Sequence, residues 1–145
     1  MSDPTPHHVG LTVADLDRAV DFYAETFDLD LAAEFAVGGE AFADAVAVDG
    51  AAADFAHLVA GGEGDGNETI VELVAYDPEG EPTPDPELNR PGAVHLGLSV
   101  DDVEAFHRGL DDDVETLSEP RTTESGTTVL FVVDPEGNLI EVLDA

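Results

Sequence analysis

Two glutamates of this sequence lie where a carboxylate is costly. Glu72 and Glu141 occupy the middle of segments 70–74 and 139–143, whose other residues are all aliphatic. Both segments have the character of buried strands. A carboxylate there costs several kcal/mol unless it is protonated, paired with a base or bound to a cation. The chain has four arginines and no lysine, and no arginine is near either glutamate in sequence, so a metal ion is the simplest partner.

Two histidines repeat in the same way. His8 and His95 open six-residue segments that match almost position for position, with Gly10 and Gly97 leaving room beside them. Two neutral imidazoles and two carboxylates suit nickel, cobalt, zinc, manganese or iron(II), and the carboxylates neutralise a divalent charge. One histidine on a strand is more often a hydrogen-bonded structural residue than a ligand. Four donors at duplicated positions favour a metal site.

The elements that position these residues begin with a β-α-β-β-β module. Alternation over 7–13 predicts a half-buried strand. Asp15 offers an N-cap, and apolar residues at helical spacing up to Phe27 predict a helix. The rest of the module is predicted as strands at 31–37, 52–60 and 68–76, a short turn or helix near 39–46, and a flexible loop at 61–66.

The second half of the chain repeats this module after a segment of different composition. Residues 77–92 contain five prolines and read as a stiff, extended linker. Asp102 repeats Asp15 ahead of a helical pattern, and strands are predicted near 114–119, 126–133 and 138–144. We therefore expect an internal duplication of the α+β class, with modules at 1–76 and 93–145 that together form one domain.

The net charge limits the classes of partner that this chain can bind. The chain has 34 acidic residues and a net charge of -30, which repels nucleic acids and anionic membranes and leaves small molecules and other protein chains. Hydrophobic residues make up 43% and fall in periodic blocks, unlike a disordered acidic protein. Such an acidic surface suits a very salty cytoplasm, so we expect an extreme halophile as the source.

Cysteine is absent, which excludes disulfides, zinc–thiolate sites and thiol nucleophiles. The first thirty residues have no export signal, and no stretch approaches the roughly 18 apolar residues of a membrane span. We expect a soluble, cytoplasmic protein.

Two segments carry a resemblance to a known family. One joins the His8 strand to the helix Leu16-Asp17-Arg18-Ala19-Val20-Asp21-Phe22-Tyr23, and the other runs from Gly126 through the turn Asp134-Pro135-Glu136-Gly137 to Glu141. They resemble the vicinal oxygen chelate superfamily of glyoxalases, bleomycin-resistance proteins and extradiol dioxygenases, over nearly the whole chain. The resemblance implies a cupped mixed sheet whose cleft holds a metal through His8, Glu72, His95 and Glu141.

The branch that the ligands resemble is bacterial-type glyoxalase I, a lactoylglutathione lyase. The resemblance implies a metal-dependent lyase or isomerase, assembled as a homodimer, that acts on a carbonyl compound through an enediolate or enolate. Glu141 or Glu72 would be its base, and Glu141 is our first choice.

Three alternatives stay open. Iron-dependent dioxygenases of the superfamily use two histidines and one carboxylate. Methylmalonyl-CoA epimerases resemble this chain in the Pro-rich linker, although they usually carry Gln at the position of Glu72. A non-catalytic binding protein of the antibiotic-resistance branch is the third, and such members usually lack the ligands.

Substrate contacts are predicted for three residues. Arg90 and Arg121 fall in predicted loops and could meet an anionic group, whereas the other two arginines lie on predicted helices as surface residues. His57 lies on a predicted strand, either facing the cleft as an extra acid or base or serving as a structural histidine. His7 is expected to point to the opposite face from His8.

Overall fold

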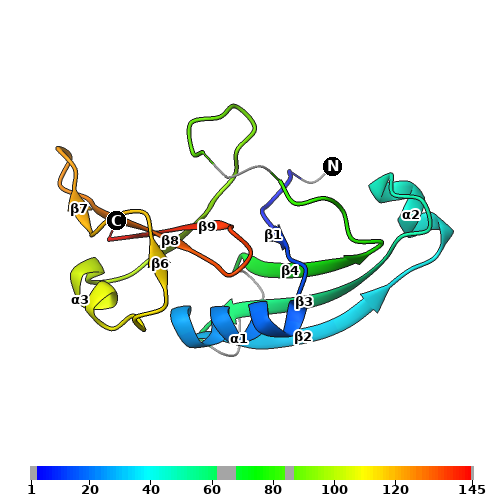
Figure 1. Cartoon of the computed structure of the whole chain (residues 1–145), viewed down its shortest axis with the longest axis horizontal. Coiled ribbons are helices and arrows are strands. Elements are labelled where there is room, and N and C mark those ends of the chain that lie inside the picture. Colours follow the sequence, from blue (N-terminus) through cyan, green and yellow to red (C-terminus); the bar gives the residue numbers. More distant parts are fainter. Residues whose placement is uncertain (1–2, 62–67, 84–86, 145) are drawn as a thin grey trace. The chain divides into compact units, whose positions relative to one another are not determined.

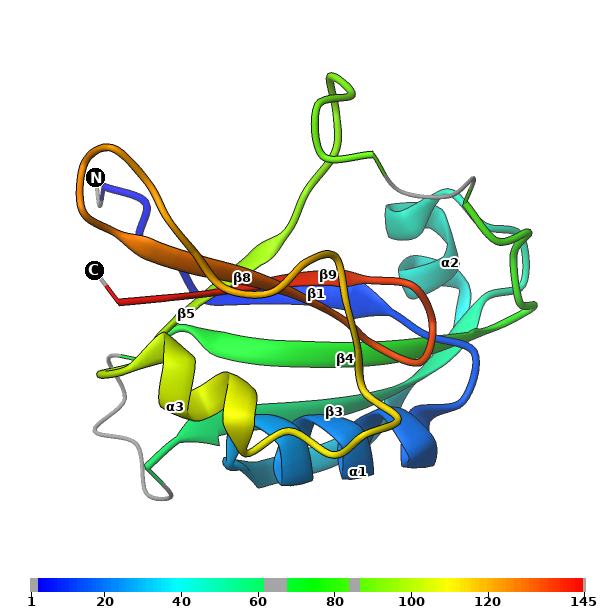
Figure 2. The same cartoon turned by 60° about the vertical axis from the view of Figure 1, so that its left-hand side comes forward.

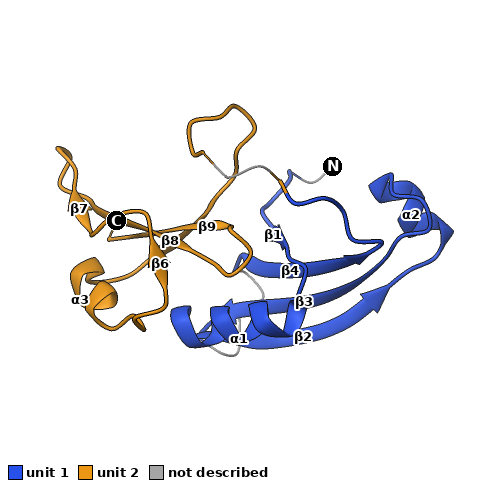
Figure 3. Ribbon diagram, in the orientation of Figure 1, with its two compact units in different colours: residues 1–82 blue, residues 83–145 orange. Residues whose placement is uncertain are grey.

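The computed structural model describes residues 3–61, 68–83 and 87–144. It divides into unit 1, residues 1–82, and unit 2, residues 83–145 (Figure 3). Unit 1 contains a four-stranded sheet and unit 2 a five-stranded sheet, each mixed and accompanied by helices. The predicted α+β class is therefore confirmed. Most of the predicted loop at 61–66 lies outside the described residues.

Unit 1 has the strand order β1-β4-β3-β2 (Figure 1). Its elements are β1 (His8–Thr12), α1 (Leu16–Phe27), β2 (Leu29–Val37), α2 (Glu40–Val46), β3 (Ala52–Ala60) and β4 (Ile70–Asp77). The first and last strands pair in parallel, while β3 is antiparallel to both of its neighbours. This pairing brings the two ends of the module together and sets Gly10 opposite Glu72.

Helix α1 forms because its sequence supplies a cap and an apolar stripe. The Asp15 side chain accepts a hydrogen bond from the Arg18 backbone N–H at 3.1 Å, as predicted for an N-cap. Ala19 and Tyr23 are fully buried, and the helix packs against β2, β3 and β4 alongside the sheet (Figure 2). The alternate positions of β3 and β4 carry His57 and Glu72, which are only partly buried.

Unit 2 repeats the arrangement with the order β5-β9-β8-β6, and β7 also pairs with β8. Its elements are β5 (Leu96–Ser99), α3 (Val103–Arg108), β6 (Glu115–Thr116), β7 (Arg121–Thr122), β8 (Thr128–Val133) and β9 (Leu139–Leu143). Strands β5 and β9 pair in parallel and set Gly97 opposite Glu141. The duplication therefore extends to the strand register.

The edge of this sheet corrects one prediction. The strand expected at 114–119 is shorter, since only β6 (Glu115–Thr116) forms there. A second short strand, β7 (Arg121–Thr122), follows beyond the expected bounds, and each of the two pairs with β8. Pro120 precedes β7 and has no N–H to give to a ladder, which explains the interruption. Arg121, predicted in a loop, is the first residue of β7.

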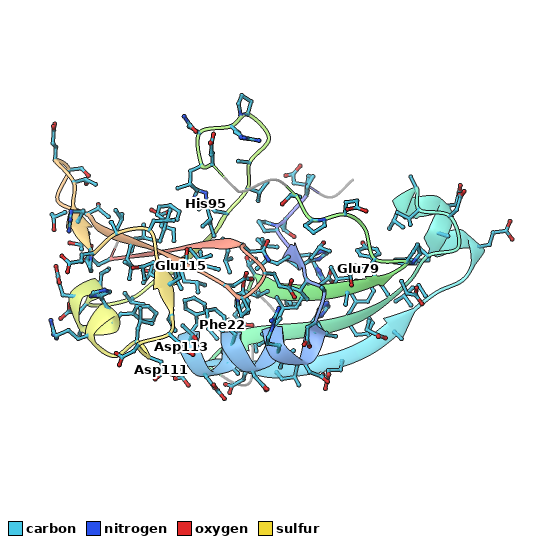
Figure 4. The ribbon with its side chains drawn as sticks, viewed as in Figure 1. Phe22, Glu79, His95, Asp111, Asp113 and Glu115 are labelled. Atoms are coloured by element: carbon cyan, nitrogen blue, oxygen red, sulfur yellow. The ribbon has the colours of Figure 1, made fainter. Side chains whose placement is uncertain are left out.

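Most acidic residues in the described ranges are exposed at the surface. Asp111, Asp113 and Glu115 follow α3 and are exposed (Figure 4). Asp134 is a buried exception at the turn between β8 and β9, where its carboxylate accepts hydrogen bonds from the backbone of Glu136 and Asn138. Within the described ranges, no helix is long and apolar enough to cross a membrane.

Candidate metal centre

In unit 1 the sheet brings a histidine and a glutamate together. Nε2 of His8 lies 3.5 Å from Oε1 of Glu72, with the two side chains 40% and 13% exposed. His8 pairs with Ile70, two residues before Glu72, so alternation along the strands directs both side chains to the same face. Parallel pairing of β1 with β4 is therefore what joins residues that are far apart in sequence.

Unit 2 contains the equivalent pair. His95 lies immediately before β5, where the Pro-rich segment ends (Figure 4). Its Nε2 is 3.2 Å from Oε1 of Glu141, and the side chains are 39% and 22% exposed. We call the His8–Glu72 pair and the His95–Glu141 pair the two half-sites.

A glycine keeps space open beside each half-site. A Cβ added at Gly10 would lie 3.8 Å from Oε1 of Glu72 and 3.9 Å from Cδ2 of His8, and one at Gly97 would lie 4.0 Å from Oε1 of Glu141. In each unit the oxygen next to this space is the one that faces the histidine. Any side chain would put carbon atoms against that oxygen.

The donors of each half-site fit a divalent ion. Ligands about 2.1 Å from a metal are about 3.0 Å apart at right angles and about 3.4 Å apart at the tetrahedral angle, close to the two Nε2–Oε1 separations of 3.2 and 3.5 Å. Each half-site offers one imidazole and one carboxylate, the donors preferred by zinc, nickel, cobalt and iron. Among the described residues no group of three or more His, Asp or Glu side chains could hold a metal by itself. Each unit thus presents a pair of donors.

His57 lies behind the half-site of unit 1. The pairing of β3 with β4 sets it opposite Glu72, and its Nε2 is 2.7 Å from Oε2 of Glu72. An ionised carboxylate can only accept, so the imidazole N–H donates. The side chains of His57 and Glu72 are 15% and 13% exposed. The sequence singled out His57 but missed this partner, because alternation within a strand does not give the register between strands.

His7 corrects another expectation. Strand alternation predicts it on the face opposite His8, yet its Nδ1 is 2.9 Å from Nδ1 of His8 and its ring centroid lies 6.4 Å from that of His57. Strand β1 begins at His8, so the alternation of a strand does not apply to His7. If His8 donates from Nδ1 to His7, its Nε2 lone pair faces Glu72 and is free for a metal.

The two arginines predicted to meet substrate have different surroundings. Nε of Arg90 donates to Oε2 of Glu87 at 3.3 Å within an exposed turn. Arg121 pairs with Val129, which pairs in turn with Leu143, so Arg121 shares the sheet face of Glu141. Only Arg121 therefore lies on the same face of a sheet as a predicted ligand of its own unit.

Comparison with known proteins agrees with this architecture. A sequence model of the Glyoxalase/Bleomycin resistance protein/Dioxygenase superfamily matches residues 5–142. A glyoxalase family protein from Bacillus cereus superposes with a TM-score of 0.82 at 21% identity, covering 99% of this chain and 95% of that one. Among curated proteins, none matches the chain.

Two glyoxalase I structures are also similar. The trypanothione-dependent enzyme of Leishmania major has a TM-score of 0.67 at 24% identity, covering 98% of this chain and 87% of that one. The enzyme of Zea mays has a TM-score of 0.63 at 20% identity, with 95% and 43% covered. At these identities the likeness establishes the fold.

Proposed function

Because the chain belongs to the glyoxalase, bleomycin-resistance protein and dioxygenase superfamily, we propose that it is a metal-dependent lyase or isomerase that acts on a small carbonyl compound, as a glyoxalase I does. The observation that carries this proposal is the duplicated half-site, with Nε2–Oε1 separations of 3.5 and 3.2 Å. A protein that only sequesters a small molecule has no need of two such donor pairs.

The proposed ligands are the two half-sites, His8 with Glu72 and His95 with Glu141. Two imidazoles and two carboxylates neutralise one divalent ion, which is nickel, zinc, cobalt, manganese or iron(II). When bound, the ion supplies a Lewis acid that polarises a carbonyl oxygen. We further propose that the protein works as a homodimer on a small-molecule substrate.

Glu141 is the proposed base. It would take the proton from a hydroxyl-bearing carbon next to the carbonyl and return it to the former carbonyl carbon. The hydroxyl proton would pass to the former carbonyl oxygen, so that the C=O moves by one carbon through an enediolate of the substrate. Glu72 is less suited to this role, because both of its oxygens face an imidazole, Oε2 at 2.7 Å from His57 and Oε1 at 3.5 Å from His8. The carboxylate of Glu141 contacts His95 through Oε1 at 3.2 Å. Arg121, on the face of Glu141, is the proposed contact for an anionic group of the substrate.

Metal analysis followed by a substrate screen tests this function. Protein purified in molar salt would be assayed with α-ketoaldehyde–thiol adducts, acyl-CoA epimers and catechols, before and after chelation. We expect isomerisation of the first class, loss of turnover on chelation, recovery with a divalent metal, and no oxygen uptake. Cleavage of a catechol with oxygen consumption would contradict the proposal and favour the dioxygenase, which needs only His8, His95 and Glu141.

A further inference from the structure

The two modules differ at one position that the duplication makes equivalent. In unit 1 the residue opposite Glu72 on the antiparallel neighbour is His57. In unit 2 the residue opposite Glu141 is Phe131. A hydrogen-bond donor thus stands behind one glutamate, and a phenyl ring, which has no such donor, stands behind the other.

The carboxylate of Glu72 is engaged from two sides. Oε2 accepts from Nε2 of His57 at 2.7 Å, whereas Oε1 faces Nε2 of His8 at 3.5 Å. The shorter contact is a well-formed hydrogen bond, and the longer one is close to the spacing of two ligands around one ion. Both partners of the short contact are largely shielded from water, which strengthens it.

The imidazole of His57 is itself held in place. The ring of Phe35 meets it edge-on with centroids 5.0 Å apart, and the ring of His8 stacks against it at 6.4 Å. Phe35 in turn stacks on Phe55 at 5.1 Å. These contacts fix the ring orientation that aims Nε2 at Glu72.

We infer that His57 is a positioning residue, which holds Oε2 of Glu72 so that Oε1 stays directed at the ion shared with His8. This inference rests on the proposed metal centre. A ligand with a fixed orientation loses less freedom on binding, and removal of an outer hydrogen-bond partner weakens metal affinity by about 10–100-fold. Glu141, backed by Phe131, has no such restraint from that position.

The test compares two substitutions of His57. His57→Phe copies the residue of unit 2 and removes the donor, while His57→Gln keeps an N–H at a similar distance along the side chain. Zinc affinity would be measured by competition with a chromophoric chelator in molar salt, together with the absorption spectrum of the cobalt(II) form and circular dichroism. We expect the zinc Kd to rise about 10–100-fold in His57→Phe, with an altered cobalt spectrum, and to stay within about threefold of wild type in His57→Gln.

One matched control variant and a second pair of His57 substitutions complete the test. His107→Phe makes the same replacement at a histidine of α3 that belongs to neither half-site, and should leave the zinc Kd unchanged. If His57→Phe does not fold, His57→Asn, whose amide is too short to reach Glu72, takes its place against His57→Gln.

Three results would overturn the inference. An unchanged Kd in His57→Phe refutes it alone and leaves the proposed function standing. Equal loss in His57→Phe and His57→Gln would make the imidazole a metal ligand in its own right. A wild-type protein that binds no divalent ion overturns the proposed metal centre and this inference together.

Discussion

The half-sites of unit 1 and unit 2 have the same donor atoms, but different side chains contact them. In each unit a parallel strand pair joins a histidine to a glutamate, with a glycine opposite the carboxylate. In unit 1 the carboxylate is bonded by His57 and the imidazole of His8 contacts His7. In unit 2 the ring of Phe131 packs edge-on to His95 at 5.2 Å. Under the proposed function the two glutamates would therefore take different roles, with Glu72 held by His57 and Glu141 carrying the proton.

The region beside each half-site differs as well. In unit 1, α2 lies between β2 and β3 and brings Phe42 against Phe55 and Tyr76, over a small core that includes Ala53 and Val74. The described part of unit 2 has no helix between β6 and β8. The inserted segment of unit 1 thus adds an aromatic cluster to the strands that carry His57 and Glu72.

Removal of salt should have the largest effect. A fall from molar salt to about 0.01 M lengthens electrostatic screening from roughly 3 to 30 Å, so the net charge of -30 repels itself across the whole chain. We predict loss of structure, and earlier loss of amide protection in unit 1, which contains Arg18 alone of the four arginines. Circular dichroism, thermal melting and hydrogen exchange measure this. An unchanged spectrum and melting temperature across that range would refute the prediction.

Substitution by glutamine should have different effects at Glu72 and at Glu141. Glutamine is nearly isosteric but cannot accept a proton at neutral pH, so Glu141→Gln should lower turnover about 10²–10⁴-fold even at saturating metal. Glu72→Gln should weaken metal binding and recover most of its turnover when metal is restored. Bound metal and saturated-metal turnover are measured for both variants. If Glu141→Gln keeps its full metal content and an undiminished rate, the assignment of Glu141 as the base is wrong.

Phe131→His gives unit 2 a hydrogen-bond donor at the position that His57 occupies in unit 1. The new donor should restrain Glu141, so we predict a metal Kd lower by up to about tenfold and a turnover lower by a similar factor. Zinc competition and steady-state kinetics on the same sample measure the two effects. Phe131→Leu is the control, and a variant with tighter metal binding and faster turnover would contradict the difference in roles.

Removal of the helix N-caps should have the smallest effect. It should be similar in the two units, because each has an Asp cap at its first helix. The side chains of Asp15 and Asp102 accept backbone hydrogen bonds at 3.1 Å at the starts of α1 and α3. Replacing either with alanine should reduce the free energy of unfolding by about 1 kcal/mol. Denaturant unfolding in molar salt measures this, with the exposed Asp111→Ala as the control. A loss no greater than that of the control would show that the caps do not stabilise the fold.

The sequence predicted the elements whose signals lie along the chain. Apolar periodicity and the Asp15 cap predicted α1, and β3 has the predicted bounds of 52–60. The repeated segments also predicted which histidine and glutamate belong to each module, and the structure brings both pairs together. Their role as metal ligands stays a prediction.

What the sequence missed depends on pairing between strands. The contact of His57 with Glu72 follows from the β3–β4 register, which no pattern within one strand reveals. The sequence predicts a loop at Arg121, because a two-residue strand after Pro120 is too short to show alternation. The face predicted for His7 is wrong because β1 begins one residue later, at His8, and strand alternation does not extend to His7.

Metal stoichiometry tests the central claim most directly. Calorimetric titration of the metal-free protein with zinc, in molar salt, would be compared for the wild type, His8→Ala in unit 1 and His95→Ala in unit 2. If the two half-sites supply one centre, the wild type binds one ion per chain with high affinity, and each substitution removes that binding. Two ions per chain, or one ion that survives either substitution, would contradict the account.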